Sequence, residues 1–454
     1  MESSLIPQPI ARAIVPVFWL TAAVPFGGVG WLLAAAGAVL PLLAPRILPL
    51  MVLTSCFFYA TMAMSSTLLY VLRAYWIAAF LAWLLVLRSA RIERRVWIWV
   101  VTVACLLAWG SLITTVRLGQ VSDTGRAVAL EAAVAFVWVL GLGAGWAWLR
   151  PRRGRLERGE VAAICSSWLV AVGYGVVQAL LGVNEATVPP DIWREIEGFR
   201  QYEDVGRHPF ASLTANGMAA VSLFPVVLLL GLARHSLAGT AVTLLLALIV
   251  GLLTLTRSYL AIVLLLVVLM VPLARTRVRV WLPLLVLMVI GGVVGLRAVD
   301  PELLSLSLRL EGDVSSLRAD IWTYTLQHLS GKDWLLGMGF GTDVWARFFA
   351  PMTLLKELQS PHSAPLEVIG QFGMIGLAVY LSIVFTVVRA YLHNRLEPVV
   401  AGVALAVLLV MARELLAASY IFSPSILATY FWILFGMALA QLPEKGEPAR
   451  ESGA

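Results

Sequence analysis

Long apolar runs, separated by short charged or proline-containing segments, dominate the pattern of the chain. A helix needs about 20 apolar residues to cross a membrane. Candidate spans lie at residues 10–26, 28–45, 47–66, 68–88, 96–116, 127–149, 160–181, 211–232, 238–255, 259–274, 280–297, 363–388, 398–415 and 420–441. The pairs at 10–45 and 238–274 are short, so the pattern predicts about 12 and up to 14 transmembrane helices.

Composition excludes most other classes of protein. Of the 454 residues, 60% are hydrophobic and 13% are charged, and the mean hydropathy is +0.89. A soluble domain is roughly half apolar and about a quarter charged, so a soluble globular protein, a disordered tail and a fibrous protein are excluded. We expect an all-α polytopic membrane protein whose residues 1–454 form a single membrane domain.

Charge predicts the orientation of the spans. The net charge of +7 comes largely from short loops, such as Arg88–Arg95, Arg150–Glu160 and Arg275–Arg279, which is the positive-inside pattern and not a nucleic-acid surface. The two long loops are acidic: 182–210 has three Arg and six acids, and 298–362 has five Lys or Arg and eight acids. We therefore expect the basic loops and both termini in the cytoplasm and the long loops outside.

The two outer loops have apolar residues of their own. Residues 192–199 of loop 182–210 predict a short interfacial helix that lies on the outer leaflet. Loop 298–362 holds many leucines and aromatic residues, which must be buried in protein or in the lipid interface. It predicts two or three short helices, broken at Gly331 and at the glycines of Gly337–Gly341.

Three arginines mark the outer face. Arg207 ends the first outer loop, Arg257 lies in a turn between two spans, and Arg318 lies in the second outer loop. Guanidinium groups bind phosphate oxygens in a bidentate fork, and a charge near the membrane often marks a substrate or pathway. The alternative is structural: an ion pair, such as Arg318 with Asp320, or a side chain that reaches to water.

His362 is the second candidate. It lies between Pro361 and Pro365, directly before a long span. An imidazole at this boundary can accept a proton from a hydroxyl group. A capping or interfacial histidine is the alternative.

Glycines and missing motifs complete the inventory. Gly337, Gly339 and Gly341 resemble a phosphate loop but lack a βαβ context, so a tight turn that lets loop and substrate approach closely is the better interpretation. The sequence has no P-loop, no HExxH and no outer Asp-x-Asp pair. We expect no metal and no cofactor, and three cysteines that only pack in apolar stretches.

An ordered series of motifs over about residues 200–390 resembles the signature region of the O-antigen ligase and polymerase superfamily. The series comprises Leu255–Ser258, Arg318–Trp322, the glycines of Leu336–Gly341, His362–Glu367 and Gly373–Leu377. The family has an asparagine after the histidine, whereas this chain has Ser363, whose hydroxyl could replace part of the hydrogen bonding of that amide.

The resemblance implies a multi-pass enzyme of the bacterial inner membrane with its active site in the periplasm, on loop 298–362. It implies transfer of a glycan from undecaprenyl diphosphate to a sugar hydroxyl of lipid A–core, in lipopolysaccharide biosynthesis, with membrane lipid around it. Arg207, Arg257 and Arg318 are expected to hold the diphosphate, with Arg257 and Arg318 also assisting catalysis. His362 is expected to orient or deprotonate the acceptor, supported by Ser363, Glu367, Gly339 and Gly341. Direct displacement would invert the anomeric centre.

Other functions remain open. An O-antigen polymerase, or a protein O-oligosaccharyltransferase of the same superfamily, would share the motifs. A transporter of an anionic solute could also use outer arginines, but transporters have ionisable residues in mid-span, and Glu131, Glu367 and Glu414 lie near span ends.

Overall fold

A computed structural model describes thirteen ranges of the chain, and all of its regular structure there is helical. The described ranges are 8–23, 48–61, 93–118, 138–152, 154–180, 215–233, 236–254, 257–270, 318–351, 360–395, 397–415, 421–422 and 426–443. The expected spans 28–45, 68–88 and 280–297 lie outside the described residues, as does the loop 182–210, and span 127–149 is described only from residue 138. The number of spans therefore stays a prediction.

The long helices follow the predicted spans closely. They are α1 (Gln8–Ala23), α3 (Leu48–Thr61), α5 (Arg94–Leu118), α7 (Arg158–Leu180), α10 (Ala215–Ala233), α11 (Leu237–Thr254), α12 (Arg257–Met270), α18 (Ala364–Asn394), α19 (Pro398–Glu414) and α20 (Ile426–Ala440). Residues 138–149 are also helical, followed by the 3-10 turn η2 (Arg150–Arg152).

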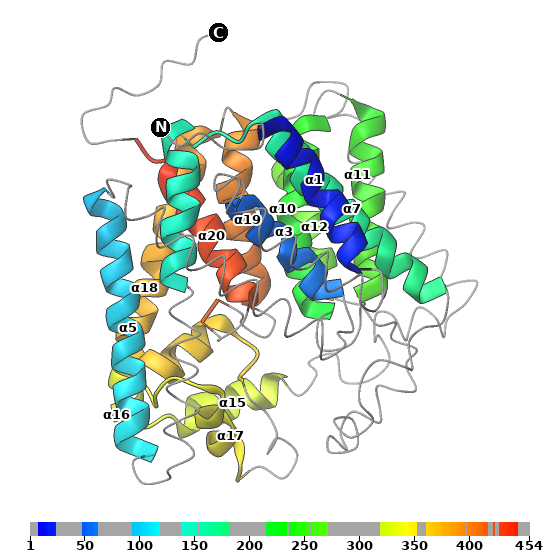
Figure 1. The fold of residues 1–454 in the computed structure, drawn as a ribbon. Helices are drawn as coiled ribbons and strands as arrows, with labels where there is room; N and C mark the ends of the chain where they lie inside the picture. Colours follow the sequence, from blue (N-terminus) through cyan, green and yellow to red (C-terminus); the bar gives the residue numbers. More distant parts are fainter. Residues whose placement is uncertain are drawn as a thin grey trace.

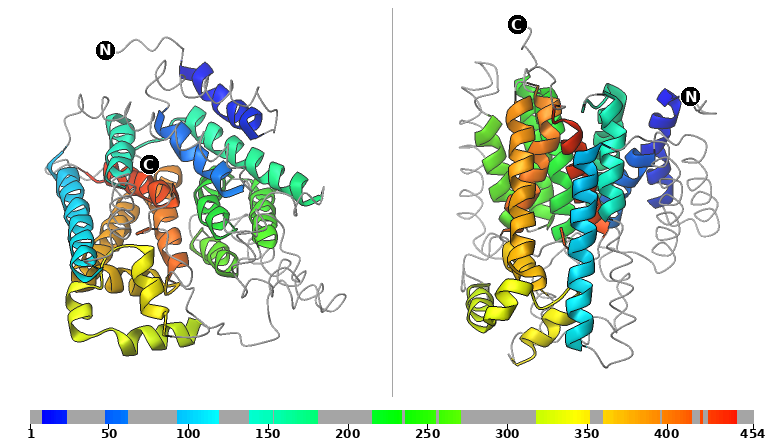
Figure 2. Two further views of the ribbon diagram at one scale, coloured as in Figure 1. Left: turned by 60° about the horizontal axis from the view of Figure 1, so that its bottom comes forward. Right: turned by 90° about the vertical axis from the view of Figure 1, so that its left-hand side faces the viewer.

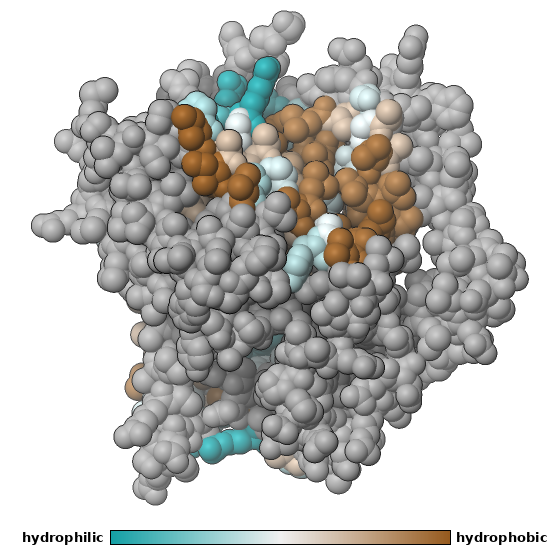
Figure 3. All heavy atoms as spheres, turned by 45° about the vertical axis from the view of Figure 1, so that its right-hand side comes forward, coloured by the Kyte–Doolittle hydropathy of each residue, from teal (hydrophilic) through white to brown (hydrophobic). Residues whose placement is uncertain are grey.

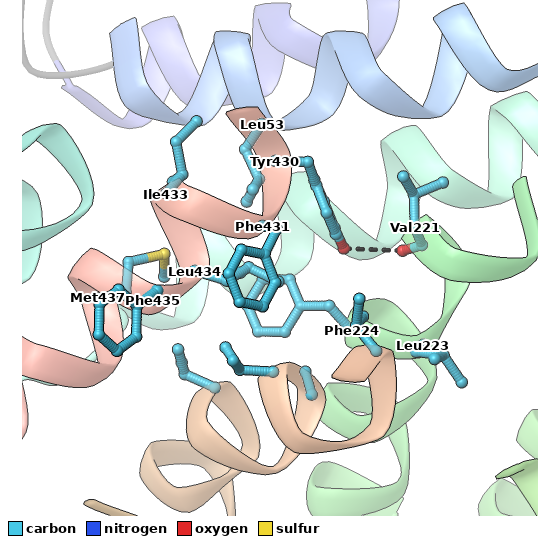
Figure 4. Close-up of a cluster of buried hydrophobic side chains, with 14 of the residues drawn as sticks. Leu53, Val221, Leu223, Phe224, Tyr430, Phe431, Ile433, Leu434, Phe435 and Met437 are labelled. Carbon is cyan, nitrogen blue, oxygen red and sulfur yellow. Dashed lines mark hydrogen bonds between the residues drawn. The ribbon is translucent and has the colours of Figure 1, made fainter. Parts of the chain in front are cut away.

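Helix α20 lies at the centre of the bundle, against α3, α18 and α19, and α10 packs beside α19 (Figure 1). Residues Leu427–Ala440 are all buried, so this helix is apolar on every side. The helix also carries a few polar groups, and one of them, the hydroxyl of Tyr430, donates a hydrogen bond of 2.8 Å to the carbonyl of Val221 on α10 (Figure 4). The ring of Tyr430 packs edge-on against that of Phe57 on α3, with ring centroids 6.2 Å apart.

Among the residues that the structure describes, two helices are long and apolar enough to cross a membrane: Arg94–Arg117 within α5, and α18. Shorter apolar helices lie at Gly217–Ala233, Ala238–Gly251 and Leu427–Ala440. Large apolar side chains remain exposed on the outside of the bundle, for example Val116 on α5 and Phe385 on α18. Figure 3 shows apolar side chains gathered on one face of the molecule. Such exposed apolar faces suit contact with lipid.

Basic residues from several loops gather at one end of the bundle. Arg150 pairs with Glu93, Arg155 bonds Glu397 at 2.9 Å, and Arg95 donates to the carbonyl of Pro443 at 2.9 Å. The described parts of two basic segments, Arg88–Arg95 and Arg150–Glu160, therefore meet at one end, whereas Arg275–Arg279 lies outside the described residues.

The opposite end carries three short helices, α15 (Arg318–His328), α16 (Gly331–Leu336) and α17 (Thr342–Phe349), which lie beside the lower end of α5 in Figure 1 and in the right view of Figure 2. We call residues 318–351 the outer unit. Trp345 and Phe349 are fully buried in a small apolar core that this unit shares with Ile369 of α18. The expected break at Gly331 falls slightly earlier, because Ser330 caps α16 and Gly331 is its first residue.

Candidate active site

The long helix α18 is broken at Gly373, and the outer unit is bound at this break. Gly373 has φ +66° and ψ −157°, so residues 364–372 form a half-helix separate from the rest of α18. The break leaves carbonyls without helical partners. That of Gly370 accepts from the amide of Met338 at 2.6 Å, and that of Gln371 accepts from the amide of Gly339 at 3.2 Å.

Residues 337–341, which we call the glycine segment, lie between α18 and α5. Gly337, Gly339 and Gly341 have φ of +83°, +118° and +125°, which L side chains rarely adopt. A Cβ on Gly337 would lie 2.3 Å from the carbonyl oxygen of Gln371, and one on Gly339 would lie 2.4 Å from Thr114 Oγ1. The tight turn is thus present, and its close approach is to helices α18 and α5.

Helix α5 contributes polar contacts that hold this turn. Thr114 Oγ1 donates to the carbonyl of Phe340 at 2.8 Å, and the amide of Phe340 donates to the carbonyl of Gly110 at 3.2 Å. Trp109 Nε1 donates to the carbonyl of Leu336 at 3.0 Å. These bonds join residues more than 220 positions apart, so α5 is part of the site's frame.

His362 directly precedes the half-helix, in an unusual backbone conformation. It is the one residue other than glycine with positive φ (+52°) among those described, and such strain often accompanies functional sites. Its amide donates to Ser360 Oγ at 3.1 Å. Burial lowers the pKa of His362 to about 4, assisted by the positive charge of Arg318 nearby. The imidazole is therefore neutral at pH 7.

Helix α15 brings Arg318 to this histidine. Arg318 is the first residue of α15, and Trp322 lies one turn further along. The indole Nε1 of Trp322 donates to the carbonyl of Pro361 at 3.0 Å, which ties α15 to the residue before His362. The structure thus brings together Arg318 and His362, which lie 44 positions apart in the sequence.

The half-helix carries the two supporting residues expected beside His362. Ser363 is its N-cap residue, is 7% exposed, and makes no hydrogen bond through its side chain as a cap. Glu367 is 3% exposed, and its Oε1 accepts from Gln371 Nε2 at 3.3 Å. Glu367 and Gln371 therefore form a buried polar pair one turn and two turns into the half-helix.

The other two arginines are placed less completely. Arg257 is the first residue of α12, and α11 ends three positions earlier at Thr254, so its backbone lies at the start of a helix, between the two spans that the sequence predicted. Its side chain, like the whole of Arg207, lies outside the described part of the structure. Within that described part, no group of three or more His, Cys, Asp or Glu residues lies together as metal ligands would.

Sequence reasoning missed the contribution of α5 and of Asp333. Arg117 in the last turn of α5 forms an ion pair with Asp333 of α16. Burial alone would raise the pKa of Asp333, but hydrogen bonds from Ser330 and Arg117 outweigh it and lower the pKa. The one available signal was a capping pattern, Ser330 followed three residues later by an acid.

The described part of the chain defines a class: a helical protein with two helices long and apolar enough to cross a membrane, and with an arginine near a neutral histidine at the base of the outer unit. Comparison with known families adds a match: residues 241–381 match the family model described as O-antigen ligase. This confirms the resemblance predicted from the motifs. The matched segment contains Arg257, Arg318, the glycine segment and His362.

The matched family also indicates a cellular location and a general type of activity. Its members are proteins of the inner membrane, and it implies a glycosyltransferase-like ligase or polymerase activity on lipid-linked glycans. No curated protein matches the chain.

Proposed function

We propose that this protein is an O-antigen ligase. It moves a glycan from undecaprenyl diphosphate to a sugar hydroxyl of lipid A–core, on the periplasmic side of the inner membrane. The observation that supports it most is the proximity of the Arg318 charge to the neutral imidazole of His362, within a segment that matches the O-antigen ligase family. A guanidinium group can bind a diphosphate, and a neutral imidazole can accept the proton of a hydroxyl group.

In the proposed reaction the acceptor hydroxyl oxygen attacks C1 of the donor sugar from the face opposite the diphosphate. The new C1–O bond forms as the bond from C1 to the diphosphate oxygen breaks, which inverts the anomeric centre. The hydroxyl proton passes to His362, and the electron pair of the broken bond leaves with the diphosphate. Arg318, together with Arg257 and Arg207, stabilises the charge that develops on this leaving group.

The electrostatics of the site favour proton transfer only when the donor is bound. Burial and the Arg318 charge both lower the pKa of His362, to about 4, which makes the imidazole a weak base. A diphosphate beside Arg318 would bring negative charge, and nearby negative charge favours the protonated imidazole. Donor binding should therefore raise the pKa of His362 and improve it as a base.

The experiment uses purified protein in detergent, undecaprenyl-diphosphate-linked glycan and lipid A–core, with products followed by gel mobility. We expect a shifted lipid A–core band that survives EDTA, is absent in His362→Gln and is strongly reduced in Arg318→Gln. His328→Gln is the matched control, because His328 is an exposed histidine of the same outer unit that stacks on Tyr324. Full activity of His362→Gln would refute the proposal.

The other products identify the alternatives. Lengthening of the donor glycan without lipid A–core would indicate a polymerase, and glycan on a protein hydroxyl would indicate an O-oligosaccharyltransferase. Uptake of an anionic solute by vesicles, without consumption of donor, would indicate a transporter.

A further inference from the structure

One carboxylate joins the outer unit to the end of α5. Asp333 forms an ion pair with Arg117. It is also the third residue of α16, where its carboxylate accepts a hydrogen bond from the amide of Ser330 at 3.0 Å and its amide donates one to Ser330 Oγ at 3.2 Å. Asp333 is 8% exposed, so this carboxylate is held on two sides in a largely buried place.

The charges suit both helices. Arg117 lies in the last turn of α5, where a cation is stabilised by the helix dipole, and Asp333 lies in the first turn of α16, where an anion is stabilised. Helix α16 has only six residues, and so short a helix is unstable without tertiary contacts. Its position therefore depends on what it binds at each end.

Helix α16 connects the two elements that carry the site. Before it, residues 329–330 lead back to α15 with Arg318. After it, the glycine segment binds the carbonyls of Gly370 and Gln371 in the half-helix that His362 precedes. A shift of α16 would move both candidate groups relative to each other.

We propose that Arg117 and Asp333 are a positioning pair, which sets the distance between Arg318 and His362 by holding α16 against the end of α5. The proposal rests on the transfer reaction proposed above, and adds to it two residues that touch neither donor nor acceptor. The side chain of Arg117 is 39% exposed, and partly exposed ion pairs contribute little to global stability. The pair should therefore affect catalytic geometry more than overall folding.

The test compares Arg117→Gln, Asp333→Asn and the double variant with Lys332→Gln. Lys332 is the exposed neighbour of Asp333 on the same helix, so this control removes a charge without touching the pair. We expect kcat to fall roughly tenfold or more in Arg117→Gln, because small misplacements of reacting groups are costly, with an unchanged KM for the lipid-linked donor. Arg117→Lys should restore most of the rate.

The double variant measures the coupling. If the two residues act as a pair, the double variant Arg117→Gln with Asp333→Asn should be no less active than the less active of the two single variants. Additive losses, or a wild-type kcat in Arg117→Gln, would overturn the proposal. Should Asp333→Asn fail to fold, Arg117→Gln still decides the matter, because it leaves the bonds between Ser330 and Asp333 intact.

A second measurement does not depend on any reaction. Hydrogen–deuterium exchange of the amides of Met338, Gly339 and Phe340, which are hydrogen-bonded in the docked unit, should be faster in Arg117→Gln and unchanged in Lys332→Gln. If the wild-type protein transfers no glycan, the proposed function fails while exchange still tests the pair. Equal exchange in wild type and Arg117→Gln would show that the pair does not hold the outer unit.

Discussion

Replacement of Gly339 by alanine should detach the glycine segment from α5. Its φ of +118° is unfavourable for an L side chain, at a cost of about 1–3 kcal/mol. The new Cβ would lie 2.4 Å from Thr114 Oγ1 and 2.9 Å from Thr114 N and Cα. Because two of these atoms are backbone of a helix, rotation of the threonine side chain cannot relieve the contact.

The segment must therefore move away from α5, which breaks the bonds from Thr114 to Phe340 and from Phe340 to Gly110. Each is worth about 1 kcal/mol, so the total loss is about 3–5 kcal/mol. Thermal unfolding in detergent, followed by tryptophan fluorescence, should show a lower midpoint. Gly331→Ala is the matched control, since a Cβ there meets nothing within 4 Å. Equal midpoints for the two variants would refute the close packing of Gly339 on α5.

Three further predictions concern single side chains. Trp322→Phe keeps the ring but removes the donor to Pro361, so kcat should fall while donor KM stays constant; an unchanged kcat would contradict a role for that bond in holding His362. His362 has a pKa of about 4 in the folded protein against 6.5 ordinarily, so its contribution to stability is complete above pH 6.5 and is lost as pH falls through 4. The midpoint of unfolding should fall over that range, and less so in His362→Gln; equal slopes would contradict the shift. Cys105 is exposed on the apolar helix α5, so in membranes a charged maleimide should not label it whereas a membrane-permeant one should; rapid labelling by the charged reagent would place this face in water.

The long helices were predictable because their boundaries are local. The span expected at 238–255 is α11 at Leu237–Thr254, and the span expected at 398–415 is α19 at Pro398–Glu414. Each boundary is marked by a charge, a proline or the end of an apolar run, which a sequence displays directly.

The candidate site was predictable only in part. Arg318 and His362 stand out because a charge and an imidazole are conspicuous beside apolar spans. The contribution of α5 is different, since the bond from Thr114 to Phe340 joins residues 226 positions apart, and no local pattern encodes such a pairing. The break at Gly373 was also hidden, because glycine is common in apolar helices and only the bound glycine segment explains its positive φ.

The seating of the glycine segment between α5 and α18 has a consequence for biosynthesis. The chain is made from its N-terminus, so α5 and the outer unit are complete before Gly370 and Gln371 have been synthesised. Until then the amides of Met338 and Gly339 lack the carbonyls that they bind in the finished protein. Contacts between distant segments form late in any case, because long loops must close first. Until α18 is made, the outer unit thus has its contacts with α5 but not those with α18, and a chain released before that point would carry all of α5 and no assembled site.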